Sequence, residues 1–340
     1  MLPFAACLAL ALAAEDSPTP TTRLDLRVEP LVTYYHLIRS AAASDEVELP
    51  AAFAPAVAAA KPLQTTLRRT LAWGPFDRQV VLCSTAAELR ERFDSVREIR
   101  LTGGRTADVH ADGGALAAAI EATYDTYLAD LWPEHRRRLE AAVAEIEREF
   151  RPHEADCFRF MLESLDMQDP KQAIPTYLVV RAQWPEAYTV RHVEGGALCV
   201  VGIEAHRGTL LHETMLHEAT HALDLATEGA SLLETIRDRL LEGGMSPRDR
   251  RLRDVPHTIM FLQAGETIRR LVDPEHVHYG DAAGYYPKVE RVVEVERPLW
   301  TEYLDGKIER DEAVDRIVEA VLAEEEQGEQ REQGRARRGR

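Results

Sequence analysis

Hydrophobic residues recur every three or four positions through much of the first half of the chain, which predicts amphipathic helices. Segment 133–150 is the clearest example. Its apolar side chains fall on one stripe, dense charge covers its other faces, and Pro133 lies near its start, where a missing N–H is tolerated. Residues 24–44 are ambiguous between strand and helix. The segments that we expect to be helical are 86–98, 115–130, 133–150 and 154–166.

Short apolar runs rich in β-branched residues predict strands farther along the chain. Residues 174–182 (IPTYLVVRA) and 197–204 (ALCVVGIE) are both bounded by turn residues. The long pattern LLHETMLHEATHALDLATEGA follows Gly208 and predicts a helix, and we expect further helices after Pro256 and over 311–323. The chain is therefore expected to be an α+β protein, mainly helical at first and with a short sheet later.

The two ends of the chain differ in composition from the rest. Residues 1–14 carry no charge, polar residues 15–23 follow them, and Ala11 and Ala13 suit a signal-peptidase site. We expect 1–14 to be a signal peptide and the protein to be exported to a periplasmic or extracellular space; the alternative is a buried N-terminal helix. No stretch reaches about 18 uninterrupted apolar residues, so no stable membrane insertion is expected after signal removal. Residues 323–340 are charged, low in complexity and expected to be disordered.

The charge balance and the cysteines narrow the function classes. The formal net charge of −17 repels phosphate backbones, so we expect no nucleic-acid partner. Beyond Cys7, the cysteines Cys83, Cys157 and Cys199 are widely spaced and form no CxxC pair. This spacing excludes a disulfide framework and a cysteine-rich zinc site, and leaves either one bridge or three buried thiols.

The pentapeptide His217-Glu218-Ala219-Thr220-His221 has the spacing of a zinc-binding motif. On a helix, residues four apart lie about 40° apart around the axis, so His217 and His221 project from one face and can reach one Zn²⁺ at roughly 2.0–2.1 Å. Glu218 lies about 100° further round, where it can take a proton from zinc-bound water and later deliver one to a leaving group. The alternative is a surface helix with two incidental histidines.

This pentapeptide within an apolar helix that follows a strand resembles the zincin metallopeptidases. The resemblance implies a zincin-like catalytic region over 171–322, after a mainly helical region over 15–170. The three-histidine metzincin pattern is excluded, because Asp224 and Thr227 stand where that group has Gly and His. A gluzincin-like arrangement, in which a Glu on a later helix supplies the third ligand, remains.

Glu266 is the expected third zinc ligand. It lies in an otherwise apolar helical stretch, where a carboxylate is costly unless it is paired or bound to metal. Arg269 and Arg270, three and four residues later, offer the alternative of a salt bridge. His257 is the second candidate for the third zinc ligand, and a contact to substrate is its other candidate role. It lies nine residues before Glu266, about 180° around the same helix, so the two residues cannot easily face one metal.

Other residues near the motif are candidates for supporting roles. Glu213 and Asp224 fall near the face of the two histidines and could orient a ligand imidazole, or be ordinary hydrogen-bonded acids. A later Gly-rich loop, residues 276–288, could supply a donor to a transition-state oxyanion, although packing is the usual role of a tyrosine. The candidate donors are Tyr279, Tyr285, Tyr286 and His278.

The sequence thus predicts a zinc-dependent metallohydrolase, with a peptidase acting on a protein or peptide as the leading hypothesis. Glu218 is expected to act as general base and then as general acid. Two alternatives stay open: a non-peptidase zinc hydrolase, and a catalytically inactive binding or scaffold protein that keeps the helix. The presence of Glu218 favours an active enzyme, because an inactive relative would keep ligands without needing the base.

Overall fold

The computed structural model of the protein describes residues 22–323 with a few short gaps. The expected signal peptide, 1–14, lies outside the described residues, and so does all but the first residue of the expected charged tail, 323–340. In the described part, no helix is long and apolar enough to cross a membrane. The residues left out between 22 and 323 are 69, 102–103, 171, 184–185, 192–195 and 228–230.

The first half of the chain is mainly helical, and the four helices expected from periodicity are confirmed to within a few residues. Segment 24–44 divides into strand β1 (Leu24–Arg27) and helix α1 (Pro30–Ala43). The expected helices are α4 (Ala86–Asp94), α5 (His110–Asp130), α6 (Trp132–Glu149) and α7 (Glu154–Leu165). The further elements are α2 (Ala54–Leu67), α3 (Gly74–Val80), the hairpin β2 (Glu98–Arg100) and β3 (Thr106–Asp108), and the short 3₁₀ turns η1 (Ala51–Phe53), η2 (Thr70–Trp73) and η3 (Arg151–His153).

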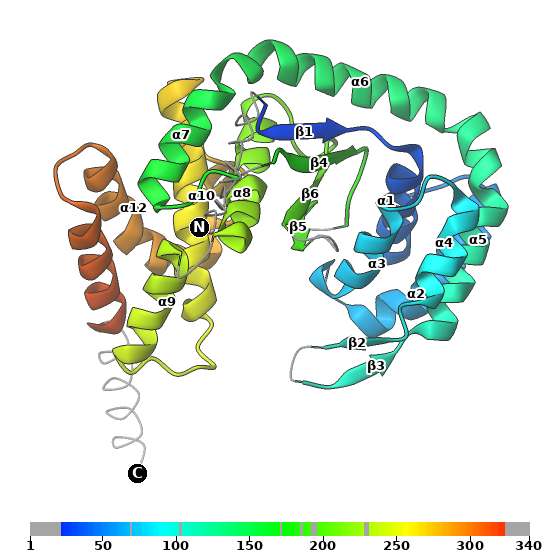
Figure 1. The fold of residues 1–340 in the computed structure, drawn as a ribbon, viewed down its shortest axis with the longest axis horizontal. Coiled ribbons are helices and arrows are strands. Elements are labelled where there is room, and N and C mark those ends of the chain that lie inside the picture. The colour runs from blue at the N-terminus through cyan, green and yellow to red at the C-terminus, as the bar shows by residue number, and fades with distance from the viewer. Residues whose placement is uncertain are drawn as a thin grey trace, which may run out of the picture.

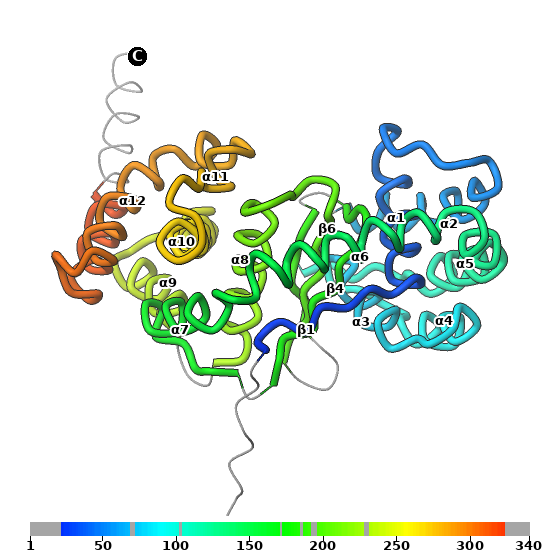
Figure 2. Tube along the Cα trace, turned by 90° about the horizontal axis from the view of Figure 1, so that it is seen from above, coloured from blue at the N-terminus to red at the C-terminus, as the bar shows by residue number. Residues whose placement is uncertain are grey.

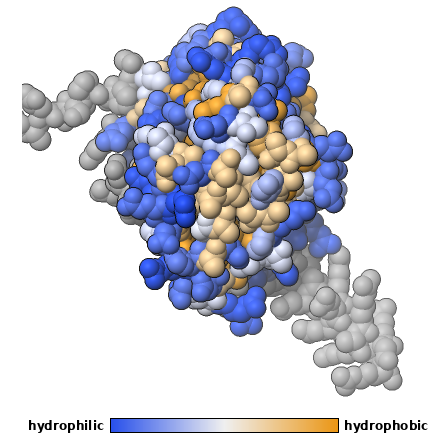
Figure 3. All heavy atoms as spheres, turned by 90° about the vertical axis from the view of Figure 1, so that its right-hand side faces the viewer, coloured by the Kyte–Doolittle hydropathy of each residue, from blue (hydrophilic) through white to orange (hydrophobic). Residues whose placement is uncertain are grey.

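These helices enclose a core of their own, formed by residues between 31 and 127. Aromatic side chains fill its centre, with the rings of Tyr34 and Tyr127 stacked at 4.4 Å and those of Phe76 and Phe93 at 4.8 Å. On the outer side of this lobe, which faces the viewer in Figure 3, the surface carries a pale orange patch. Helix α6 then runs from this lobe across the molecule to α7, as Figure 1 shows.

A small mixed sheet lies between the two groups of helices. Its order is β1-β4-β6-β5, in which β1, β4 (Ile174–Val179) and β6 (Ala197–Gly202) are parallel and β5 (Ala187–Arg191) runs antiparallel to β6 at the edge. The two expected strands are confirmed as β4 and β6, whereas β5 has no counterpart among the expected strands. Alternate residues point to opposite faces, so one face packs on α8 and the other packs near α1.

The second half contributes a larger core built on α8 (Thr209–Ala226) and α10 (Arg251–Leu271), which lie side by side in Figure 2. The helix expected after Pro256 begins earlier, at Arg251. The side chain of Asp249 accepts the N–H of Arg251 at 2.8 Å and so helps to start the helix, which carries Pro256 inside it. The remaining helical elements are α9 (Leu232–Glu242), α11 (Tyr279–Ala282), η4 (Tyr286–Val289), α12 (Glu290–Leu304) and a helical segment over 310–323.

The fold is therefore α+β, as expected, with a large core on one face of a small sheet, a smaller hydrophobic cluster on its other face and a separate core in the first helical lobe. Helices α6 and α7 pack with the second core although they precede residue 171. The three cysteines of the described part, Cys83, Cys157 and Cys199, are free thiols. Burial raises the pKa of each thiol, so none of them is an activated nucleophile.

Candidate metal centre

Helix α8 carries the pentapeptide and is buried along most of its length. It begins after Gly208, whose φ of 55° and ψ of −137° suit a residue without a Cβ. Leu211, Met215 and Leu216 pack into the core around it, so its backbone position is fixed by hydrophobic contacts on the sheet side. This leaves His217 and His221 on the side of α8 that faces α10.

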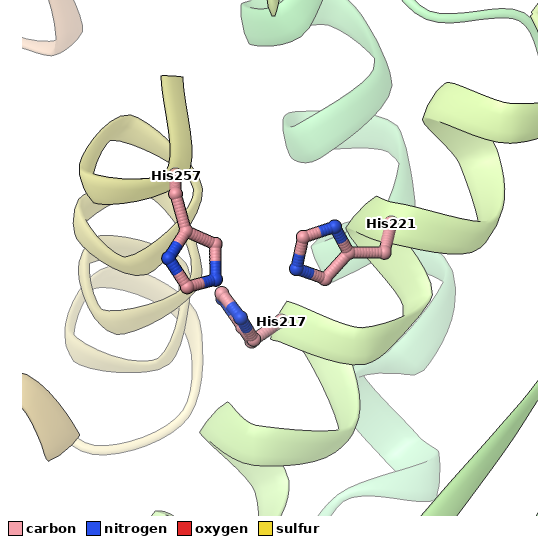
Figure 4. A group of neighbouring side chains, drawn as sticks. All are labelled: His217, His221 and His257. Atoms are coloured by element: carbon pink, nitrogen blue, oxygen red, sulfur yellow. The ribbon is translucent and has the colours of Figure 1, made fainter. Parts of the chain in front are cut away.

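A third histidine, His257 of α10, completes a cluster with this pair. One potential ligand atom from each of the three histidines lies within 4.8 Å of the others, and no other such group of His, Cys, Asp or Glu occurs among the described residues. Figure 4 shows the three rings pointing toward one another from α8 and α10. The ring centroid of His257 lies 5.0 Å from that of His217 and 5.2 Å from that of His221.

All three imidazoles are held in the neutral form, which is the form that binds a metal. Burial and the two neighbouring histidines keep the pKa of His217 well below its usual range. Burial lowers the pKa of His221 to about 3, with His257 adding to the effect, and burial with Arg253 nearby lowers that of His257 to about 4. Protonation of this cluster is therefore disfavoured at neutral pH.

Two aromatic residues orient the cluster. The ring of Phe261, one turn after His257 on α10, stacks on His217 with centroids 3.7 Å apart. The hydroxyl of Tyr285 lies 3.2 Å from Nδ1 of His257, which leaves Nε2 of that ring free to face the other histidines. A hydrogen bond at one ring nitrogen fixes the orientation and tautomer of a ligand histidine.

The cluster fits a zinc ion by its donor set. Three neutral imidazoles are a ligand set that zinc enzymes use, with a fourth position left open for water or substrate. Nδ1 of His217 is buried and has no hydrogen-bond partner among the described residues, as expected for a polar atom that belongs to an incomplete site. Sulfur ligands play no part, since the thiols of the described part lie outside the group.

Glu218 lies next to this cluster on α8 and is 4% exposed. Oγ1 of Thr189, on the edge strand β5, lies 2.8 Å from Oε2 of Glu218 and 2.9 Å from its backbone oxygen. Burial raises the pKa of Glu218 to about 8, although the hydrogen bond with Thr189 opposes the shift.

The hydroxyl of Thr189 is the donor in this contact. A hydroxyl has one proton, so Thr189 can donate to only one of the two oxygens of Glu218 at a time. The hydrogen bond with Thr189 engages Oε2 of Glu218 and leaves Oε1 out of it.

The structure places Glu266, the expected third ligand, away from the histidine pair. Its carboxylate accepts hydrogen bonds from Arg269 at 2.5 and 2.7 Å and from Arg270 at 3.0 Å, and its Oε1 lies 3.3 Å from Nε2 of His278. Burial alone would raise the pKa of Glu266, but His278 and the two arginines lower it to about 2. Glu266 is therefore the paired acid of the alternative interpretation, and His257 takes its place beside the pair.

The two acids considered as orienting groups also have other partners. Oε2 of Glu213 accepts a hydrogen bond from the backbone N–H of Tyr279 at 2.6 Å and lies 2.7 Å from Nε2 of His276. Asp224 accepts a hydrogen bond from the hydroxyl of Ser231. Neither carboxylate is hydrogen-bonded to His217 or His221 in the described part of the chain.

The four candidate oxyanion donors separate into two groups. Tyr285 contacts His257, and Tyr279 stacks on Phe261 with centroids 5.9 Å apart, so both rings belong to the surroundings of the cluster. Tyr286 instead lies under the guanidinium of Arg297, 4.5 Å from its ring centroid. His278 lies against Gly265 and Glu266, and a Cβ at Gly265 would approach its ring to 2.6 Å.

Thr189 and Phe261 were not among the residues expected at the site. Phe261 could have been found from its spacing, because it lies four residues after His257 on a helix. Thr189 lies in a short strand with no strong signal of its own. No protein-family model matches the chain, and neither a curated protein nor a solved structure matches it.

Proposed function

We propose that this protein is a zinc-dependent hydrolase that cleaves peptide bonds, with His217, His221 and His257 as the zinc ligands and Glu218 as the general base. The observation that carries the proposal is the convergence of three imidazoles from α8 and α10 beside the buried carboxyl group of Glu218. The order of ligands and base along α8 agrees with a zincin-like core.

Each residue has a separate part in hydrolysis. A zinc ion held by the three histidines would supply Lewis acidity toward the substrate carbonyl and toward water. Glu218 accepts the proton of the attacking water and passes it to the leaving amine. Thr189 holds Oε2 of Glu218, so that Oε1 is the oxygen presented to water. Tyr285 holds the ring of His257 in the orientation needed for binding.

The edge strand β5 supports a peptide as the substrate. It pairs with β6 on one side, and no other strand of the described part pairs with its outer edge. A free strand edge offers backbone N–H and C=O groups to an extended peptide. Because Thr189 of this strand contacts Glu218, a peptide laid along the edge would run beside the general base.

The test combines metal analysis with cleavage of fluorescein-labelled casein. Wild type and Glu218→Gln are both expected to bind about one zinc per chain, and only wild type is expected to cleave, because Gln cannot accept the proton. Glu163→Gln changes an exposed acid that makes no described ion pair and serves as the matched control. Cleavage by Glu218→Gln at the wild-type rate, or a wild-type protein that cannot be loaded with zinc, would contradict the proposal.

A further inference from the structure

A cavity of about 370 Å³ opens at the free edge of β5. Its walls come from β5, α3 and the hairpin strand β2, which bring together segments far apart in the sequence. The charged side chains that line it are Arg78 of α3, Glu98 and Arg100 of β2, and Arg191 of β5. Basic groups therefore outnumber acidic ones here, in a chain whose net charge is −17.

One residue of the cavity wall, Thr189, contacts the candidate metal centre. This residue lines the cavity and also contacts Oε2 of Glu218 at 2.8 Å. Arg191 lies two residues farther along β5, so its side chain leaves the same face of the strand at a distance of about 7 Å along it. If the scissile bond of a bound peptide lies at Glu218, the side chain of a residue one or two positions from that bond would thus lie near the cavity.

The three arginines have no acid partner in the described part of the chain. Arg78 is half-buried, and Arg100 and Arg191 are exposed. Nη1 of Arg78 lies 3.8 Å from where a Cβ of Gly74 would be, which places the guanidinium at the cavity wall. Glu98 lies in the same cavity but makes no ion pair with any of the three within 4.0 Å. Elsewhere many arginines of the chain are paired with acids at 2.5–3.0 Å, as Arg137 and Arg270 are.

Unpaired arginines around one cavity favour an anionic ligand, because like charges repel until a counter-charge is present. Guanidinium groups match the planar carboxylate in geometry and can bind it through two parallel hydrogen bonds. We propose that this cavity is a subsite for a carboxylate of the substrate, either an Asp or Glu side chain or the free C-terminus of a peptide. The proposal deepens the proposed peptidase function and rests on it for the identity of the ligand as a peptide.

The test measures binding of peptides to zinc-loaded Glu218→Gln protein, so that turnover does not interfere. Fluorescein-labelled octapeptide pools carry a central Glu or Gln between randomised flanks, each with a free or an amidated C-terminus. A side-chain subsite predicts that Glu pools bind about three- to tenfold tighter than Gln pools whatever the terminus. A terminal-carboxylate subsite predicts the same ratio between free and amidated pools instead.

Variants on the same background assign the effect to the cavity. Arg100→Gln and Arg191→Gln change exposed side chains and are each expected to remove most of the carboxylate preference, whereas Glu98→Gln is expected to increase it. Arg248→Gln, an exposed arginine outside the cavity, is expected to leave the preference unchanged. Equal binding of all pools, undetectable binding of every pool up to about 1 mM, or a preference that survives both arginine variants would overturn the proposal.

The outcomes separate this proposal from the proposed function. Wild-type cleavage of casein without any carboxylate preference in binding would leave the peptidase and remove the subsite. A carboxylate preference that depends on Arg100 and Arg191, in a protein that never cleaves peptides, would leave a carboxylate-binding cavity and remove the peptidase.

Discussion

Oγ1 of Thr189, on the edge strand of the sheet, lies 2.8 Å from Oε2 of Glu218 on the metal-site helix. This contact joins the free strand edge to the residue that we propose as the general base. Strand β5 is in turn fixed from its other face, where the hydroxyl of Tyr188 accepts a hydrogen bond from Nη1 of Arg39 at 2.9 Å. The position of Glu218 thus depends on residues of both halves of the chain.

Loss of the Thr189 hydroxyl should impair catalysis while leaving the zinc in place. Thr189→Val keeps the side-chain shape but removes the donor, so kcat is expected to fall about fivefold, the effect of losing one hydrogen bond of about 1 kcal/mol. Thr189→Ser keeps the hydroxyl and is the matched control. Equal kcat values for Thr189→Val and wild type at equal zinc content would show that the contact does not orient Glu218.

Substitution of His257 should weaken zinc binding strongly, whereas substitution of Glu266 should not. His257→Ala is expected to purify with less than about a tenth of the wild-type zinc, because two histidines alone hold the ion weakly. Glu266→Gln is expected to keep about one zinc per chain but to unfold more easily, since Arg269 and Arg270 lose their counter-charge. Zinc content measured by mass spectrometry decides between the two residues, and the reverse pattern would restore Glu266 as ligand.

Removal of one partner of the buried Arg39–Asp77 pair should destabilise the fold strongly. Both side chains are 0% exposed and their atoms Nη1 and Oδ1 lie 2.5 Å apart. Asp77→Asn leaves Arg39 as an uncompensated buried charge and is expected to cost about 3–5 kcal/mol in urea unfolding.

The exposed Asp45, which makes no described ion pair, provides the matched control for this prediction, and Asp45→Asn is expected to change stability by less than about 0.5 kcal/mol. Replacement of both partners by Arg39→Met and Asp77→Leu is expected to recover much of the loss, because no buried charge remains. A loss from Asp77→Asn no larger than that of Asp45→Asn would mean that the buried pair is not formed in solution.

Glu296 should make the protein less stable as the pH rises. This carboxyl group is 0% exposed, and neither of its oxygens has a hydrogen-bond partner in the described part of the chain. Burial, with Asp254 nearby, raises its pKa well above the ordinary value of 4.5. The folded protein therefore keeps this proton at pH values where the unfolded chain has released it, so raising the pH favours unfolding.

The variant Glu296→Gln removes this titration. The free energies of unfolding of Glu296→Gln and wild type are expected to be similar at about pH 4. Near pH 8 the value for Glu296→Gln is expected to exceed that of wild type by roughly 1–3 kcal/mol. Urea unfolding of both proteins across this range measures the difference. A difference that stays constant with pH would show that Glu296 is not protonated in the folded protein.

The sequence predicted the elements whose patterns are long or strongly apolar. Helix α6 follows clear periodicity, helix α5 is a long alanine-rich stretch, and the buried strands β4 and β6 are continuous apolar runs. The edge strand β5 escaped detection because it has only five residues, of which Thr189 and Arg191 on one face are polar. Its pairing with β6 depends on tertiary contacts that no local pattern encodes.

The choice of third ligand depended on which face of α10 meets α8. The nine-residue spacing correctly places His257 and Glu266 on opposite sides of one helix, but helical geometry alone does not say which side faces the histidine pair. Burial of a carboxylate fits both a ligand and a salt bridge. Only the packing of α10 against α8, α9 and α12 turns His257 toward His217 and leaves Glu266 to Arg269 and Arg270.

X-ray absorption at the zinc K-edge of zinc-loaded wild-type protein tests the central claim most directly. The proposed site predicts a first shell of three imidazole nitrogens and one further light atom at about 2.0–2.1 Å, and the loss of one imidazole contribution in His257→Ala reloaded with zinc. A protein that takes up no zinc, or a first shell with fewer than three imidazoles that is unchanged by His257→Ala, would contradict the account.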